Sequence, residues 1–236
     1  MFDDTYSAAL LATHDITKSF GTVKALAGVS LTIASGESVA IMGPSGSGKS
    51  TLLHCLSGVL TPDNGPVLFA GKDLTRMSDA QRSHLRLHNF GFVFQDGQLI
   101  PELPARENVA LPLLLTGTRR RTALAKADEV LAKIGIPDLA DRRPSDMSGG
   151  QAQRVAIARA LAANPRVVFA DEPSGALDQA TGHEVMQLLT ATAAQAGASL
   201  VMVTHDPAVA RWCSRLVEIR DGLVHADRRL DVEVAR

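Results

Sequence analysis

Cysteine is scarce in this sequence of 236 residues, which contains only Cys55 and Cys213. Neither has a second Cys or a His at the spacing that metal ligands use, which argues against a disulfide framework and against a zinc site. We therefore expect both to be small, buried hydrophobic residues.

Long hydrophobic runs are also missing. The strongest apolar stretch, residues 109–115, is interrupted by Pro112 and falls far short of the roughly 20 residues that a membrane span needs. Near the start of the chain, Asp3 and Asp4 stand where a signal peptide would carry Lys or Arg. The sequence thus predicts a cytosolic chain that crosses no membrane by itself.

No excess of either charge is present, since 24 Lys and Arg face 25 Asp and Glu, for a net charge of −1. The chain therefore lacks the broad positive field of a nucleic-acid binder, and we expect no nucleic-acid partner. Hydrophobic residues make up 45% and charged residues 21%, which is typical of a globular protein. Any anion bound here must be held by local geometry.

Three short apolar runs, residues 39–42, 167–170 and 200–203, end at polar or glycine residues, as buried strands do. Helical patterns follow the first run, over 49–58, and precede the second, over 151–163. Strands that alternate with helices indicate a mainly parallel sheet in an α/β fold.

Between these runs the sequence loses its strand-like segments and becomes rich in Ala, Leu, Arg and Lys, which indicates a helical insertion. The predicted organisation is therefore an α/β core over 10–95 and 165–226, a helical subdomain over 96–164, and a short tail over 227–236.

A glycine-rich segment follows the first predicted strand and opens a helix, in the phosphate-loop pattern GxxxxGK[ST]. Its backbone N–H groups and the helix N-terminus suit a phosphate, Lys49 supplies a positive charge, and Ser50 can hold Mg²⁺. The residues that we expect to bind the nucleotide here are Gly43, Ser45, Gly46, Ser47, Gly48, Lys49, Ser50 and Thr51.

Asp171 and Glu172 follow the second predicted strand, at the sheet edge where open α/β proteins bind ligands. Asp171 suits Mg²⁺ through water, and Glu172 suits the orientation of an attacking water. An acidic pair after a strand is otherwise a solvated turn, so this interpretation depends on the phosphate loop.

A second glycine-rich helix start, Ser148, Gly149, Gly150 and Gln151, lies before the long helix. No second lysine motif accompanies it, so one nucleotide shared between two chains explains both sites. The alternative is that this segment is merely a helix cap and turn.

Together these segments, with Gln95, Asp178 and His205, resemble the nucleotide-binding subunit of an ATP-binding-cassette (ABC) transporter over residues 10–225. The resemblance implies a P-loop NTPase with a RecA-like α/β core, an antiparallel β part and an inserted α-helical subdomain. It also implies ATP hydrolysis with ATP and Mg²⁺ bound, by a head-to-tail homodimer.

The resemblance assigns roles residue by residue. Lys49 and the loop amides would bind phosphates, Glu172 would be the general base, and His205 would contact the γ-phosphate as a switch. The implied metal ligands are Ser50, Gln95 and Asp171. The signature segment Ser148, Gly149, Gly150 and Gln151 would close over the ATP of the second copy, and Asp178 would communicate across the dimer.

Phe20 takes the place of the usual tyrosine that stacks on adenine and keeps its π-face.

Residues 94–113 resemble the MacB-like branch, whose members serve macrolide or peptide efflux, lipoprotein release, haem export and cell-division control. This implies a transmembrane permease partner and a place at the cytoplasmic face of the cell membrane. The candidates for the groove that receives a permease helix, or for the helical subdomain's own core, are Leu99, Ile100, Pro101, Leu103 and residues 109–115. The alternative functions are a soluble ABC ATPase and a division-type regulatory cassette. No residue selects the transported substrate.

Overall fold

The computed structural model describes residues 9–230 of the chain. These residues form two compact units, the first made of the chain up to Arg86 and from Ser199 onward, and the second of Leu87–Ala198. The signal-peptide argument on Asp3 and Asp4 concerns residues outside the described range, and so does the end of the predicted tail, 231–236.

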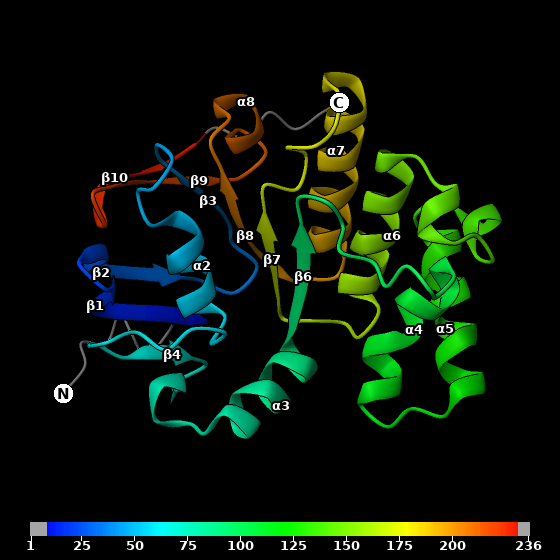
Figure 1. Cartoon of the computed structure of the whole chain (residues 1–236), viewed down its shortest axis with the longest axis horizontal. Helices are drawn as coiled ribbons and strands as arrows, with labels where there is room; N and C mark the ends of the chain where they lie inside the picture. Colours follow the sequence, from blue (N-terminus) through cyan, green and yellow to red (C-terminus); the bar gives the residue numbers. More distant parts are fainter. Residues whose placement is uncertain (1–8, 231–236) are drawn as a thin grey trace. The chain divides into compact units, whose positions relative to one another are not determined.

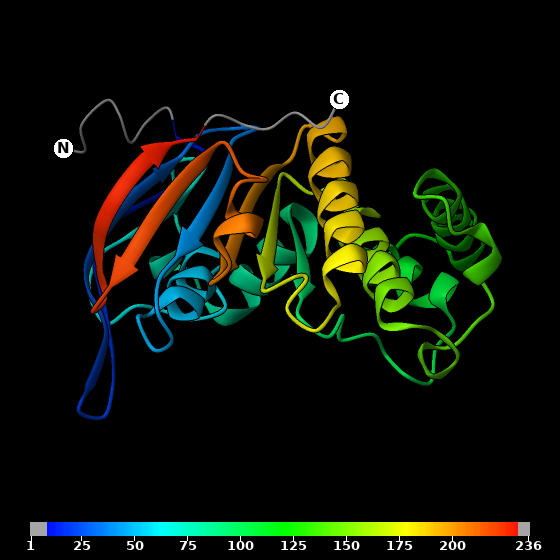
Figure 2. The same ribbon diagram turned by 90° about the horizontal axis from the view of Figure 1, so that it is seen from above.

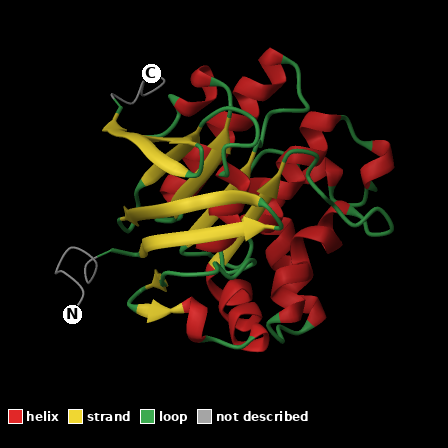
Figure 3. Cartoon of the chain, turned by 60° about the vertical axis from the view of Figure 1, so that its left-hand side comes forward, coloured by secondary structure: helices red, strands yellow, loops and turns green. Residues whose placement is uncertain are grey.

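The first unit contains an antiparallel sheet of four strands in the order β2-β1-β4-β5. Its strands are β1 (Leu11–Phe20), β2 (Val23–Ile33), β4 (Val67–Phe69) and β5 (Lys72–Asp73). Strands β1 and β2 form a long hairpin that runs from Leu11↔Ile33 to Phe20↔Val23, with several register shifts (Figure 3). The structure thus contains the antiparallel part that the family resemblance implied.

The same unit contains the strand that leads into the phosphate loop. Strand β3 pairs in parallel with β8 and with β9, and β10 is antiparallel to β9 (Figure 1). The bounds of these strands are β3 (Ser38–Met42), β8 (Ser199–Thr204), β9 (Arg215–Arg220) and β10 (Leu223–Arg229). The helices are α2 (Lys49–Leu56), the short α8 (Pro207–Ala210), a 3₁₀ turn (Leu74–Arg76), and α3 (Asp79–Asn89), in which the chain passes into the second unit.

Both predicted strands of this unit, 39–42 and 200–203, are confirmed with one more residue on at least one side. The predicted tail, 227–236, differs from the structure, because residues 227–229 form the end of strand β10. There, Asp227 accepts hydrogen bonds from Arg215 at 2.6 and 2.7 Å, which the charge pattern alone could not reveal.

The second unit combines one parallel strand pair with four helices. Its strands β6 (Phe90–Phe94) and β7 (Val167–Asp171) pair in register from Phe90↔Val167 to Phe94↔Asp171. Its helices are α4 (Ala105–Leu115), α5 (Arg120–Lys133), α6 (Gly149–Leu161) and α7 (Gln179–Gln195), with 3₁₀ turns at Pro137–Leu139 and Pro144–Asp146. Helices α6 and α7 run alongside each other (Figure 2).

Small apolar residues let helices α4, α5 and α6 approach closely in one buried core. Its members include Val109, Ala127, Leu131 and Val155, each fully buried. Residues 109–115 were open to two interpretations. The structure confirms the core interpretation for part of the stretch, and the permease groove stays a prediction. Val109 lies in this core, Leu113 and Leu114 pack against it, and Leu115 at the end of α4 is 63% exposed.

Strand β6 approaches α6 so closely that a side chain at Gly91 would collide with it. A Cβ at Gly91 would lie 2.4 Å from the Ala160 carbonyl oxygen, a backbone atom that cannot easily move. We expect Gly91→Ala to lower the free energy of unfolding by about 1–3 kcal/mol, the usual cost of overpacking. Denaturant unfolding followed by circular dichroism measures this change.

The control is Gly182→Ala in α7, where the new Cβ would lie at ordinary contact distances of 3.4 Å from the Ser174 Cβ and 4.0 Å from the Ser174 carbonyl oxygen. Alanine is a better helix former than glycine by up to about 1 kcal/mol, so this variant should be neutral or more stable. Equal unfolding midpoints for both variants would contradict the contact between Gly91 and Ala160.

Cys55 and Cys213 are both buried and free of disulfides, as the sequence predicted. Burial raises the pKa of each thiol to about 12. Both therefore remain protonated at neutral pH and act as small apolar residues. Within residues 9–230, no helix is both long and apolar enough to cross a membrane.

Candidate functional site: two strand ends and two helix starts

The phosphate-loop residues link strand β3 to helix α2 in the first unit, as the sequence predicted. Two glycines are required by close backbone approach: a Cβ at Gly43 would lie 2.1 Å from the Ile219 carbonyl oxygen, and one at Gly48 would lie 2.2 Å from that of Ala25. Gly48 also has a φ of 99°, which favours glycine. The loop is therefore folded tightly against β2 and β9.

Lys49 is the first residue of α2 and only 8% exposed, and its Nζ donates a hydrogen bond to the Pro44 carbonyl oxygen at 2.8 Å. The ammonium group is therefore held across the loop, beside the positive end of the helix dipole. Within the described part of the chain, the Ser47 hydroxyl is a buried polar group that has no hydrogen-bond partner. A cation, exposed amide groups and a spare hydroxyl suit an oxyanion such as phosphate.

His205 lies at the same sheet edge as the phosphate loop. Strands β3 and β8 pair in parallel, with Met42 opposite Thr204, so Gly43 and His205 leave the sheet at neighbouring positions. The next residue, Asp206, caps the short helix α8 by accepting from the Ala208 N–H at 2.8 Å, which fixes the turn that carries His205. The structure therefore brings these two predicted site segments together.

Phe20 ends strand β1 at the tip of the long hairpin, where its ring is 52% exposed. The Lys18 ammonium lies 5.8 Å from the ring centroid, over one face. Strand β2 of the same hairpin contacts the phosphate loop at Ala25. An exposed ring on this hairpin is suited to stacking against a flat ligand.

The second unit also has two neighbouring parallel strands whose carboxyl ends lead into predicted site residues. Strands β6 and β7 are parallel, with Phe94 opposite Asp171, so Gln95 and Glu172 leave the sheet side by side. The Gln95 side chain reaches the loop after Glu172, because a Cβ at Gly175 would lie 3.2 Å from the Gln95 Nε2. Carboxyl ends of parallel strands are where open α/β sheets bind ligands.

Glu172 has a φ of 49°, in the left-handed region that residues other than glycine rarely adopt. The turn is closed by the Gly175 N–H, which donates to the Glu172 carbonyl oxygen at 3.0 Å. Backbone strain of this kind persists only where surrounding contacts enforce it, and it is common at functional sites.

The signature segment begins helix α6 with a capping box. The Ser148 hydroxyl accepts from the Gln151 N–H at 3.3 Å, and the Gln151 Oε1 accepts from the Ser148 N–H at 3.0 Å. The Gln151 side chain is therefore engaged in its own helix cap, a contact that the alternative interpretation of this segment as a cap anticipated. The capping interpretation is confirmed, whereas anion binding by this segment stays a prediction, with the amides of Gly149 and Gly150 still at the helix start.

Asp178 caps helix α7 and lies near the signature segment. It accepts from the Thr181 hydroxyl at 2.7 Å and from the Thr181 N–H at 3.1 Å, and these bonds lower the pKa of its carboxyl group. A Cβ at Gly150 would lie 2.4 Å from the Thr181 Cγ2, so Thr181 contacts both segments. The second unit therefore brings Asp178 and the signature glycines together.

Comparison with known proteins identifies the family. The family model for the ABC transporter matches residues 26–175, which include the phosphate loop, the signature segment and Glu172. The chain belongs to the ABC transporter family. It is thus an ATP-binding cassette with ATPase activity, as the motifs predicted.

Two curated relatives place this cassette in the branch that residues 94–113 indicated. It is 44% identical to the lipoprotein-releasing system ATP-binding protein LolD of Geobacter metallireducens, over 93% of this chain and 100% of that protein. It is 46% identical to the macrolide export ATP-binding/permease protein MacB 1 of Aeromonas hydrophila, over 93% of this chain and 34% of that protein. The cassette therefore spans a whole LolD but about a third of a MacB.

A solved structure supports the fold. A dimeric ATP-binding cassette in a post-hydrolysis state, bound to ADP and Pi, superposes with a TM-score of 0.85 at 40% identity, and the match covers 94% of this chain and 99% of that one. The predicted P-loop NTPase fold with a helical insertion is confirmed.

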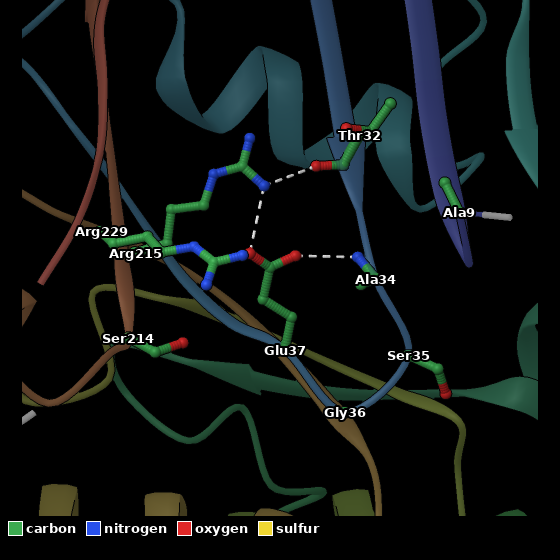
Figure 4. Close-up of a pocket in the computed structure, with 9 residues that line it drawn as sticks. All are labelled: Ala9, Thr32, Ala34, Ser35, Gly36, Glu37, Ser214, Arg215 and Arg229. Carbon is green, nitrogen blue, oxygen red and sulfur yellow. Dashed lines mark hydrogen bonds and ion pairs between the residues drawn. The ribbon is translucent and has the colours of Figure 1, made fainter. Parts of the chain in front are cut away.

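The ABC cassette also has a polar cavity of about 510 Å³ at the opposite end of β3 from the phosphate loop. Figure 4 shows Arg215 between the Thr32 carbonyl oxygen, at 2.8 Å, and Glu37, at 3.1 Å. Asp227 completes this cluster, and its hydrogen bonds hold the pKa of Arg215 above its usual range. We interpret the cluster as a structural one, because its hydrogen bonds link the turn between β2 and β3 to strands β9 and β10.

Sequence reasoning missed Gln153 and Arg159 of helix α6, which contact the segments around Gln95 and Glu172. Their partners are backbone carbonyl oxygens, which every residue has, so the sequence alone does not reveal these contacts. Helix α6 holds four long polar side chains, Gln151, Gln153, Arg154 and Arg159, and the sequence does not distinguish the two that contact these loops.

Proposed function

We propose that this ABC ATPase hydrolyses ATP between the phosphate loop of one copy and the signature segment of a second copy, and that it drives a separate transmembrane permease. The proposal of a dimer rests on two glycine-rich helix starts, at α2 and α6. Only the start of α2 has a lysine. A nucleotide shared between two copies uses both. The dimeric cassette with ADP and Pi supports this arrangement.

Within each copy, we assign phosphate binding to Lys49 and the loop amides, γ-phosphate contact to His205, base stacking to Phe20, and communication across the dimer to Asp178. Glu172 is the general base, because its carboxylate follows β7 directly and can orient and deprotonate a water. The strained backbone at Glu172 supports a functional role.

Mg²⁺ would be held by Ser50, Gln95 and Asp171, whose hydroxyl, amide and carboxylate oxygens are the ligands that this ion prefers. When bound, the ion neutralises charge on the β- and γ-phosphates. Residues 9–230 contain no group of three or more His, Cys, Asp or Glu side chains that could hold a metal by itself. Such a sparse protein contribution is usual for an ion that also binds phosphates.

The permease partner is supported by the names of the relatives, a lipoprotein-releasing system and a macrolide export protein. We therefore place this chain at the cytoplasmic face of the cell membrane, in an exporter or a mechanotransmission complex. Leu115, exposed at the end of α4, together with the partly buried Leu99, is a candidate contact for a permease helix.

The test is to purify the tagged chain from detergent-solubilised membranes with ATP and to identify the proteins that accompany it by mass spectrometry. We expect a transmembrane permease to be enriched over a purification with the tag alone. A permease with a large extracytoplasmic domain supports the MacB-like branch. A chain recovered entirely from the soluble fraction, with no membrane protein, would overturn the proposal in favour of a soluble ABC ATPase.

A further inference from the structure

Gln153 is a buried polar residue of helix α6, with 2% of its surface exposed. Its side-chain Nε2 donates two hydrogen bonds, to the Phe94 carbonyl oxygen and to the Pro173 carbonyl oxygen, both at 2.8 Å. Both N–H groups of the amide are therefore used, and each acceptor belongs to a different loop.

These two acceptors flank the residues to which hydrolysis is assigned. Phe94 is the last residue of β6 and directly precedes Gln95, and Pro173 directly follows Glu172. One side chain thus ties together the two loops that leave the neighbouring strands β6 and β7. Phe94 also accepts from the Gly97 N–H at 3.1 Å, which closes the turn that contains Gln95.

Arg159, six residues further along α6, holds the same loop at a second place. Its Nη1 donates to the Gln98 carbonyl oxygen and its Nη2 to the Gly97 carbonyl oxygen, both at 2.7 Å. Burial lowers the pKa of this guanidinium group. This partly buried cation donates to two carbonyl oxygens of one loop and so fixes their position.

Two of the six non-glycine residues with a positive φ in the described part of the chain lie in the loops that α6 holds. Gln98 has a φ of 43° and Glu172 has a φ of 49°, both in the left-handed region although neither is glycine. Arg159 binds the Gln98 carbonyl oxygen, and Gln153 binds the carbonyl oxygen of the residue after Glu172. A strained backbone requires such contacts to persist.

From these contacts we propose that Gln153, assisted by Arg159, is a positioning residue for ATP hydrolysis. Its hydrogen bonds hold the loops of Gln95 and Glu172 in the positions that hydrolysis requires. The inference rests on the proposed roles of Gln95 and Glu172. Because α6 begins at the signature segment, the helix that meets the second copy's ATP also carries the side chains that hold these two loops.

The test replaces Gln153 with methionine, which has a similar volume but no donor. We expect kcat for ATP to fall about 10- to 100-fold, because displacements near 1 Å at a reacting centre have effects of this size. The dissociation constant for ATP should change less than about twofold, since Lys49 and the phosphate loop lie in the other unit. Gln187→Met, on the exposed face of α7, is the matched control and should leave kcat unchanged.

A double variant separates positioning from general damage. If Gln153 acts through Glu172, Gln153→Met should lower the residual rate of Glu172→Gln by about threefold or less, whereas a merely structural defect would lower both rates by the same factor. Should Gln153→Met fail to fold, Arg159→Lys keeps the charge and loses the paired donors, and we expect it to lower kcat about 3- to 10-fold.

The outcomes are distinct. An inactive Glu172→Gln protein beside normal Gln153→Met and Arg159→Lys proteins would overturn the positioning role and leave the proposed function intact. A Glu172→Gln protein with normal kcat would overturn the assigned base and the positioning role that rests on it. Loss of kcat in Gln153→Met with unchanged ATP binding, and a smaller loss in the double variant, would support the inference.

Discussion

Replacement of Lys49 by alanine is expected to weaken ATP binding at least about 100-fold and to abolish hydrolysis. The Lys49 ammonium lies at the start of α2 and is 8% exposed, so water cannot replace it well. A hydrogen bond to a charged group contributes about 1.5–3 kcal/mol, and the loss of the local positive charge adds to this. Isothermal titration with ATP and Mg²⁺ measures the dissociation constant directly.

The control for this variant is Lys72→Ala, which removes an exposed lysine from β5 of the same unit. It should bind ATP like the unmodified protein. Lys49 also donates to Pro44, so unfolding curves must show that Lys49→Ala is folded. Full ATP affinity in a folded Lys49→Ala protein would contradict the assignment of the phosphate loop.

Replacement of Glu172 by glutamine should lower kcat about 10²- to 10⁴-fold while ATP remains bound, because the amide keeps the shape of the side chain but cannot accept a proton. With hydrolysis blocked, the state with ATP between two copies should accumulate. Phosphate release reports the rate, and light scattering coupled to gel filtration reports a dimer that forms with ATP but not with ADP.

Glu129→Gln in α5 is the control, since Glu129 is exposed and forms only a surface ion pair with Lys126 at 3.1 Å. This variant should hydrolyse ATP at the normal rate and remain monomeric after turnover. If Glu172→Gln were a monomer with normal turnover, both the assigned base and the shared-nucleotide arrangement would be wrong.

The phosphate loop and the signature segment could be recognised in the sequence because their patterns are local. The loop between β3 and α2 needs glycines, a lysine and a hydroxyl at fixed spacing, and a helix start shows its own capping residues. The three apolar runs predicted β3, β7 and β8 because a strand buried on both faces reads as a continuous apolar segment.

Other features depended on contacts between distant residues. Gln153 binds Phe94, 59 residues earlier, through a carbonyl oxygen that every residue possesses. Strand β6 was not predicted, since its five residues include Gly91, whose presence is explained only by the approach of Ala160. The long β1–β2 hairpin was implied only by the family resemblance, because its register shifts break any regular alternation.

The left-handed backbone at Glu172 had no sequence signal either. Glycine or asparagine would mark such a position, whereas glutamate normally favours helices. The role of general base that we propose for Glu172 accounts for a glutamate at this position. Local conformational preference is thus overruled where the chemistry is proposed to occur, as expected of a working site.

The burial of Cys55 and Cys213 makes this chain a convenient host for chemical probes. A thiol with a pKa of about 12 is almost entirely protonated at neutral pH, and both sulfur atoms are shielded from reagents. A cysteine introduced at an exposed position would therefore react with a maleimide fluorophore or a nitroxide label long before the native thiols. The association of two copies during turnover could then be followed by energy transfer, with no need to remove either native cysteine from the core.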